Sequence, residues 1–172
     1  KENKISNTNL KELEKFIANG SISNIHEALR ILVQRSLAEY DLEKSKANDE
    51  SWYKFYLTEK EIEQKMLRDG KINNRKLADI IYEYCKENKI SNISSDKLCE
   101  DIANGYIYNI QEAMNILEKR NVAEFDFRSF KSINEMWYKF YFTKEEIEKK
   151  LIRDGKICGK KLANIIYKYC KE

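Results

Sequence analysis

"LEKRNVAEFDF", residues 117–127, changes its hydrophobic period halfway along. Its first half is typical of the last turns of an amphipathic helix, whereas its second half alternates apolar and charged residues. In a strand, Ala123, Phe125 and Phe127 would lie on one side and Glu124 on the other. A helix that leads directly into a half-buried strand is the feature that decides the fold, and "LVQRSLAEYDL" at 32–42 repeats it.

The whole chain is a tandem repeat with a period of 85 residues. The alignment needs no gap through Cys85 and Cys170, and about 48 of the 85 pairs are identical. "KENKISN" opens both copies, and "WYKFY" recurs at 52–56 and 137–141. The sequence therefore predicts two domains with one fold, residues 1–85 and residues 86–172. Because the chain ends on the "KE" that opens each copy, we expect that the parent protein can hold further copies.

The first part of each copy predicts two helices. Leu10 to Ala18 reads as a short helix, and Gly20 behind it can take the left-handed conformation that ends a helix. Asn24 and Glu27 form a capping-box pattern, which starts a second helix that runs to about Ser36. The apolar residues of the second helix share one face at a period of 3.6, namely Ile25, Ala28, Leu29 and Leu32.

The second part of each copy predicts a β-hairpin and two further helices. Residues 37–57 read as a hairpin, with a polar turn at 43–50 and the strand "SWYKFYL" after it. Thr58 and Glu61 form a capping box for a third helix, which Asp69-Gly70 ends. A fourth helix follows from about Asn74 to Lys86.

This order of helix, turn, helix, strand, polar loop and strand resembles the winged helix-turn-helix of bacterial regulators of the MarR type. "LCEDIANGYIYNIQEAMNILEKRNVAEFDF" at 98–127 follows the layout of that family. Asn121, and Ser36 in copy one, stand where the family has a glycine before the strand. The resemblance implies a mainly α (α+β) fold of two tandem helical modules, each with a helix-turn-helix followed by a β-hairpin wing. It also implies duplex DNA as the partner.

The second helix of each copy would then enter the major groove with the face opposite its apolar residues. That face carries types of side chain that read base edges, and Arg30 and Asn115 are the first candidates. The candidate residues are Ser23, Arg30 and Gln34 in copy one, and Tyr108, Asn115 and Lys119 in copy two. Glu27 and Glu112 share the face and count against DNA, because phosphates repel carboxylates. A merely solvated helix face explains the same pattern.

The predicted wings supply lysine and arginine side chains that can contact phosphates without reading sequence. These candidates are Lys44, Lys46, Arg128 and Lys131. A further basic group lies near the end of copy two, where it forms either a solvated face or a second phosphate contact: Lys149, Lys150, Arg153, Lys156, Lys160 and Lys161.

Composition limits the class of protein. Hydrophobic residues make up 42% and charged residues 35% of the 172 residues, with a net charge of only +3, which neither proves nor excludes a nucleic-acid partner. No apolar run approaches the roughly 20 residues of a membrane span. The four cysteines lack C-x-x-C spacing and there is one histidine, so we expect a reduced, intracellular protein (cytoplasmic or nuclear) without a metal site.

No motif of catalysis is present in the sequence. It has no glycine-rich phosphate loop and no nucleophile with a base at plausible spacing, so we predict no enzyme, no catalytic residue and no cofactor. The preferred function is a non-enzymatic DNA-binding protein, an accessory of transcription or replication. The alternative is a protein–protein interaction scaffold of tandem helical repeats that does not bind nucleic acid. The outward glutamates favour the scaffold, and the helix-to-hairpin pattern favours DNA.

Overall fold

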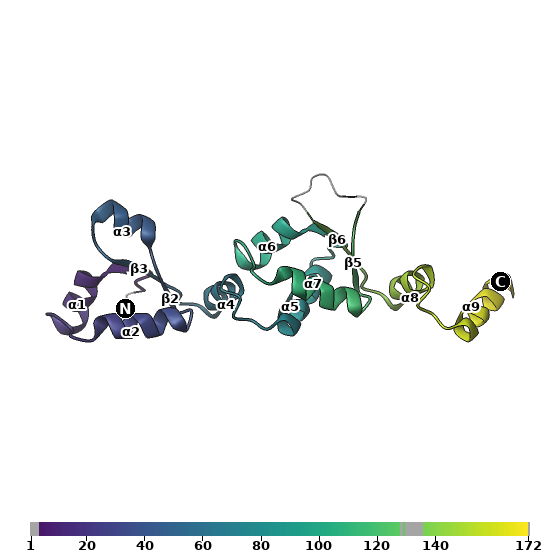
Figure 1. Ribbon diagram of the computed structural model, residues 1–172, viewed down its shortest axis with the longest axis horizontal. Coiled ribbons are helices and arrows are strands. Elements are labelled where there is room, and N and C mark those ends of the chain that lie inside the picture. The colour runs from purple at the N-terminus through teal and green to yellow at the C-terminus, as the bar shows by residue number, and fades with distance from the viewer. Residues whose placement is uncertain (1–3, 128, 130–135, 172) are drawn as a thin grey trace. The chain divides into compact units, whose positions relative to one another are not determined.

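The computed structural model describes residues 4–127, 129 and 136–171, and it divides the chain into two compact units (Figure 1). Unit 1 is Lys1–Lys71 and unit 2 is Ile72–Glu172. Each unit combines helices with a three-stranded antiparallel sheet, so the predicted mixture of α and β structure is confirmed. The units do not begin where the sequence copies begin, because the helix that closes copy one belongs to unit 2.

Unit 1 builds a small sheet between its helices. Its elements are β1 (Asn7–Asn9), α1 (Leu10–Ala18), α2 (Ile25–Gln34), β2 (Ala38–Tyr40), α3 (Leu42–Asn48), β3 (Trp52–Phe55) and α4 (Glu59–Arg68). The strand order is β1-β3-β2, with Asn7 opposite Lys54 and Ala38 opposite Phe55. The central strand is therefore the one rich in aromatic residues, which suit a half-buried pleated surface.

Unit 2 repeats this sheet and precedes it with a helix. Its elements are α5 (Asn74–Glu87), β4 (Asn92–Ser94), α6 (Ser95–Ala103), α7 (Ile110–Lys119), β5 (Ala123–Phe125), β6 (Trp137–Phe140), α8 (Lys144–Arg153) and α9 (Gly159–Lys171). The strand order is β4-β6-β5. In the strand "WYKF" of β6, Tyr138 and Phe140 are buried and Lys139 between them is exposed, as the period of two requires.

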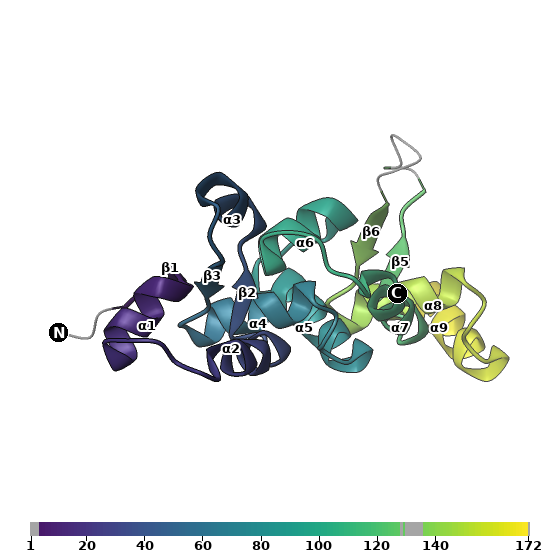
Figure 2. The same ribbon diagram turned by 60° about the vertical axis from the view of Figure 1, so that its left-hand side comes forward.

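The core of unit 2 lies where α5 packs against α7, and Figures 1 and 2 show the two helices side by side. The apolar side chains on the facing sides are fully buried at 0% exposure: Leu77, Ala78 and Ile81 on α5, and Ala113, Met114 and Leu117 on α7. Their spacing of one, three and four residues places each set on one helix face. Burial of these side chains, rather than helix propensity, is the main stabilising contribution to this pair of helices.

Most of the predicted helices are confirmed with their caps. The Thr58 hydroxyl oxygen accepts from the Glu61 backbone N–H at 3.2 Å, and the Glu61 carboxylate accepts from the Thr58 backbone N–H at 2.9 Å. Thr143 begins α8 with the same capping box. Gly70 and Gly155 end these helices with a φ of 65°, which is the left-handed conformation.

Two details of the prediction are wrong, and two short strands are missing from it. Asn19, with a φ of 50°, takes the left-handed position after α1, and Gly20 does not. Asn24 makes no capping hydrogen bond through its side chain, so the capping box predicted for the second helix is absent there. The strands Asn7–Asn9 and Asn92–Ser94 were not predicted, because each has only three residues and is held by pairing with a distant strand.

The turn predicted at 43–50 is also wrong, because α3 occupies most of it. The Asp41 side chain accepts from the Lys44 backbone N–H at 2.9 Å and caps the helix. The Ser45 hydroxyl accepts from the Trp52 backbone N–H at 2.8 Å, which fixes α3 to the start of β3. Copy one therefore carries a helix at the tip of its two strands, in place of a simple hairpin (Figure 2).

The junctions between α2 and β2 and between α7 and β5 need a left-handed residue. Ser36 has a φ of 58° and Asn121 a φ of 60°. The Leu37 N–H then donates to the Leu32 carbonyl at 3.0 Å, and the Val122 N–H to the Leu117 carbonyl at 3.1 Å. These bonds close the helix ends and turn the chain directly into the strands.

Candidate nucleic-acid interface

The rotation of α7 is fixed by the residues that it buries. Ile110, Ala113, Met114 and Leu117 face the core of unit 2. The side chains on the opposite face are exposed, and they are the four that the sequence singled out: Tyr108, Glu112, Asn115 and Lys119. Tyr108, in the turn before α7, is 74% exposed. The helix thus presents one phenol, one carboxylate, one amide and one ammonium group to solvent.

Asn109 anchors the N-terminal end of α7. Its side-chain amide donates to the Ile72 carbonyl at 3.1 Å and to the Asn74 side chain. The amide is thereby engaged with Ile72 and with the first residue of α5, and the Asn109 side chain makes no capping bond to its own helix. The start of the candidate helix is held by the helix that packs behind it.

Gln111 is a residue of this face that the sequence analysis missed. Its amide N–H donates to the Asn115 side-chain oxygen at 3.4 Å, one turn further along α7. Its own carbonyl accepts from the Tyr138 hydroxyl at 3.0 Å. Asn115 is therefore linked through Gln111 to a buried tyrosine of β6, which restricts the rotamers of both amides. The spacing of four residues between Gln111 and Asn115 was the signal available in the sequence.

The equivalent face of α2 in unit 1 is also exposed, but its cation is paired. Ser23, Arg30 and Gln34 all lie at the surface, as does Glu27. The guanidinium of Arg30 binds the Glu27 carboxylate with two bonds, at 2.7 and 2.9 Å. A contact of Arg30 with a base or phosphate would first have to break this pair. The loss is small, because exposed ion pairs contribute about 0–1 kcal/mol.

The predicted wing residues have different settings. Lys44 and Lys46 belong to α3, not to a loop. The Lys44 ammonium lies 4.8 Å from the centre of the Trp52 ring, where the ring face stabilises the cation. Arg128 and Lys131 lie outside the described residues.

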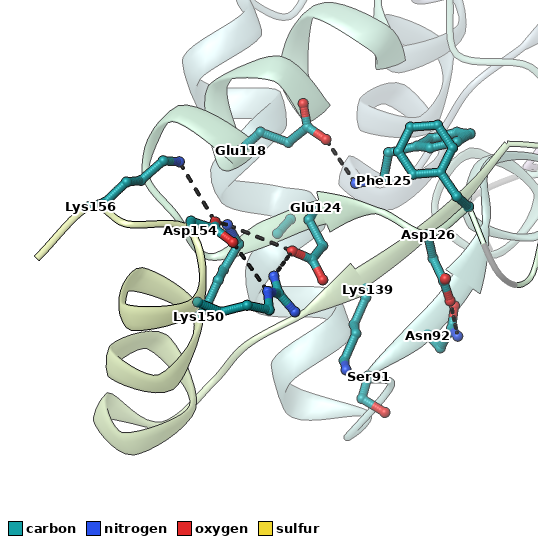
Figure 3. Close-up of a pocket in the computed structure, with 13 residues that line it drawn as sticks. Ser91, Asn92, Glu118, Glu124, Phe125, Asp126, Lys139, Lys150, Asp154 and Lys156 are labelled. Carbon is teal, nitrogen blue, oxygen red and sulfur yellow. Dashed lines mark hydrogen bonds and ion pairs between the residues drawn. The ribbon is translucent and has the colours of Figure 1, made fainter.

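A groove between β5 and α8 holds an interlocked network of ion pairs (Figure 3). Lys150 is only 5% exposed, and its ammonium lies 2.6 Å from the Asp154 carboxylate and 3.7 Å from that of Glu124. Arg153 also binds Glu124, which in turn accepts from the Tyr141 hydroxyl. This network ties α8 to the strand that follows the candidate helix.

The groove is balanced in charge and offers no excess of cations for a phosphate. Its lining carries equal numbers of acidic and basic side chains: Glu118, Glu124, Asp126 and Asp154 with Lys139, Lys150, Arg153 and Lys156. Burial and the hydrogen bond to Glu124 raise the pKa of Tyr141 to about 12, so its hydroxyl stays protonated at neutral pH. The hydrogen bond from Lys150 holds the pKa of Asp154 below its usual value.

Unit 1 contains the same network at the matching positions. Lys65 lies 3.5 Å from Glu39 and also pairs with Asp69, and the Tyr56 hydroxyl donates to Glu39. Lys71 lies 3.5 Å from Asp69 and donates to the Ser36 hydroxyl at 2.8 Å. The network recurs in both units and joins the helix after each sheet, α4 or α8, to a strand of that sheet. Its evident role is to hold this helix in place.

The basic group predicted near the end of copy two is mostly neutralised. Lys149 pairs with Glu145 at 2.6 Å, and Lys161 with Glu148 at 2.9 Å. Lys156 donates to the Asn121 side chain at 2.8 Å. Together with the pairing of Lys150 and Arg153, these contacts leave the group poorly suited to attract a polyanion.

Tyr106 is a second exposed residue that the sequence analysis missed. It is 69% exposed in the turn between α6 and α7, two residues before Tyr108. A small pocket beside the two tyrosines is lined by the apolar residues Cys99, Ile110 and Met136 together with the acidic residues Asp96 and Glu100. This mixture of apolar and acidic side chains differs in character from the α7 face.

The described residues hold neither a cluster of metal ligands nor a helix that could span a membrane. Within residues 4–127, 129 and 136–171, no three or more histidine, cysteine or acidic side chains gather as metal ligands would. No helix in that part of the chain has the length and apolar character needed to cross a bilayer.

Comparison of the chain with protein-family models, with curated proteins and with solved structures gave no significant match.

Proposed function

We propose that the chain is a non-enzymatic DNA-binding protein that uses winged-helix modules. The exposed polar face of α7 carries this proposal, because Asn115 and Lys119 stand on a helix whose opposite face is locked into the core. A rigid helix with outward amide and ammonium groups suits the major groove, which admits a helix and displays donors and acceptors.

The order of the elements supports the proposal. From α5 to β6, unit 2 runs helix, strand, helix, helix, strand, strand, with β6 paired between β4 and β5. This order matches the one expected of a winged-helix module, in which α6 and α7 would form the helix-turn-helix. The left-handed Asn121 stands where the family that the sequence resembles has a glycine, and it supplies the conformation that a glycine would give.

The differences between the two copies support sequence-specific contacts. On α2 and α7 the buried residues are kept or nearly kept, as in Ile25 and Ile110. Three of the four outward positions differ, because Ser23, Arg30 and Gln34 correspond to Tyr108, Asn115 and Lys119. Two such faces on one chain would bind two different half-sites, and the linkage would raise the affinity of the second contact through its effective concentration.

The test is a titration of fluorescently labelled duplex DNA with the protein. Fluorescence anisotropy measures binding at about 50 and 200 mM salt. We expect binding that weakens steeply with salt. Asn115→Ala should cost about 1–3 kcal/mol on the preferred sequence and relax the preference there, as for a base contact. Lys119→Ala should lower the slope of log K against log salt by about one, as for a phosphate contact.

The matched control is Lys144→Ala. Lys144 is also exposed, but it lies at the start of α8, so this variant removes the same charge away from the α7 face. Its salt dependence should equal that of the unaltered chain. Equal losses in Lys119→Ala and Lys144→Ala would reduce the interaction to general charge attraction, and absence of binding to any duplex at low salt would end the proposal.

A protein partner is the second candidate, and the tyrosines before α7 favour it. Tyr106 and Tyr108 stand beside a pocket with apolar lining, and exposed aromatic residues are enriched in protein interfaces. Glu112 next to them would be repelled by phosphates. The test is a pull-down with the chain as bait. If the chain is a scaffold without DNA affinity, Tyr108→Ala should lose the bound partner protein and Lys119→Ala should keep it.

A further inference from the structure

Helix α9, the last helix of the described residues, has an apolar face that stays largely exposed. None of its residues is buried, and Ile166 is 54% exposed. Leu162, Ala163, Ile166 and Cys170 correspond to Leu77, Ala78, Ile81 and Cys85 of α5, and each pair is identical in residue type. The four residues of α5 are 0% exposed.

Unit 1 carries an open surface of the matching kind. On α2, Ala28 is exposed and Leu32 half-buried, whereas the corresponding Ala113 and Leu117 on α7 are completely buried. On α1, Ala18 is exposed, whereas the corresponding Ala103 on α6 is completely buried. The buried members of these pairs belong to the helices of unit 2 against which α5 packs.

The packing of α5 in unit 2 therefore shows how α9 could pack on α1 and α2. In the repeat, α5 corresponds to α9, and the helices α6 and α7 that α5 contacts correspond to α1 and α2. The α9 helix and the α1–α2 surface keep nearly all the apolar residues of that packing, with Leu29 in place of Met114. Leucine and methionine fill similar volumes, so the change costs little.

We propose that α9 of one chain docks on α1 and α2 of a second copy of this chain, in the geometry with which α5 packs against α6 and α7. The mode is a helix laid in an apolar groove, with anchors spaced by one, three and four residues. The interface is heterologous, because two different surfaces meet. The pair then still offers one free α9 and one free α1–α2 surface, so association continues until a ring closes or the copies run out.

Docking leaves the candidate DNA face free. On α2, Ala28 and Leu32 lie on the side opposite Arg30 and Gln34 at 100° per residue. Loss of association and loss of DNA binding are therefore separable, and either proposal can fail without the other.

The first measurement is the molar mass of the chain in solution. Sedimentation or light scattering gives this mass over a wide range of protein concentration. We expect a mass that rises above the 20.5 kDa of one chain as concentration increases. Ile166→Glu on α9 and Ala28→Glu on α2 should each return the mass to that of one chain. Both positions are exposed and glutamate is a good helix former, so circular dichroism should show that the fold is kept.

The decisive measurement mixes the two variants. Ile166→Glu keeps a working α1–α2 surface and Ala28→Glu keeps a working α9, so the mixture should form a dimer of one copy of each and nothing larger. Lys168→Glu is the matched control, because Lys168 lies on the far side of α9 and has Glu83 as its counterpart. This control should associate like the unaltered chain.

Asn164→Asp adds a test of the geometry. In unit 2, Asp79 of α5 pairs with Arg120 at 2.5 Å, and the corresponding residues are Asn164 and Arg35. The substitution would restore the pair across the interface and strengthen association by at most about fivefold. A chain that stays monomeric at the highest concentration, or variants that do not complement each other, would overturn the proposal.

Discussion

Helices α2 and α7 carry the same alanine and leucine at corresponding positions, yet these residues reach different burial. Ala113 and Leu117 on α7 are completely buried, whereas Ala28 and Leu32 at the same positions of α2 are not. The residues are identical, so the difference lies in what covers them. In unit 2 that cover is α5. The apolar face of a helix therefore provides residues that can be buried, and a neighbouring element decides whether they are.

The largest expected difference is in thiol reactivity. At pH about 8, Cys170 should react with a thiol reagent at least about 100-fold faster than Cys85, because a buried thiol is reached only after the unit opens. Burial raises the pKa of Cys85 to about 12, which also leaves little thiolate. Mass spectrometry of the labelled peptides in dilute solution measures both rates. Equal rates would show that α5 is not held against α7.

Core truncation should distinguish the two units next. Leu117→Ala should lower the free energy of unfolding of unit 2 by about 2–5 kcal/mol, because it opens a cavity at a fully buried site. Leu32→Ala should cost unit 1 clearly less, since Leu32 is already half-buried.

Each unit has one tryptophan, so the two unfolding curves can be recorded separately. Trp52→Phe leaves Trp137 to report on unit 2, and Trp137→Phe leaves Trp52 to report on unit 1. Denaturant titrations followed by fluorescence then give both free energies. A loss in Leu32→Ala as large as that in Leu117→Ala would contradict the difference between the units.

The smallest expected effect comes from the ion-pair network, which both units share. Asp154→Asn should cost about 1–3 kcal/mol, because Lys150 loses a charged hydrogen-bond partner. The pKa of Asp154 is lowered in the folded chain, so its contribution is complete above about pH 4 and is lost as the pH falls through the folded value. Unfolding measured from pH 6 down to pH 3 should show that Asp154→Asn is less acid-sensitive than the unaltered chain. An unchanged acid sensitivity would mean that the carboxylate is not bound to Lys150.

The helices that carry their own local signals were predictable. Thr58 with Glu61 starts α4, and Asp69-Gly70 ends it, by contacts within a few residues of each other. The exposed face of α7 was predictable too, because the 3.6-residue period of its apolar residues places Asn115 and Lys119 outside. Local contacts are present in any window of the sequence, which is why these features could be read from it.

The features that depend on distant contacts were not predictable. The strand Asn7–Asn9 has no alternation of its own and exists through its pairing with β3. The polar residues of α3 favour a turn when the sequence is considered alone, although Asp41 as a capping residue is a signal for the helix. The sequence could not assign α5 to unit 2, since the period of 85 residues is the same wherever the repeat is said to begin.

Because the repeat can be said to begin at any residue, the structural units need not begin where the sequence copies begin. This has a consequence for how a gene of this kind gains further copies. An unequal crossover that inserts 85 codons adds one complete set of elements whatever codon it starts from, because the order of elements is cyclic. The inserted segment meets neighbours of its own kind on both sides, so no new packing surface has to arise. The exchange point is thereby released from selection on folding, and a recombination break inside a helix is as acceptable as one in a loop.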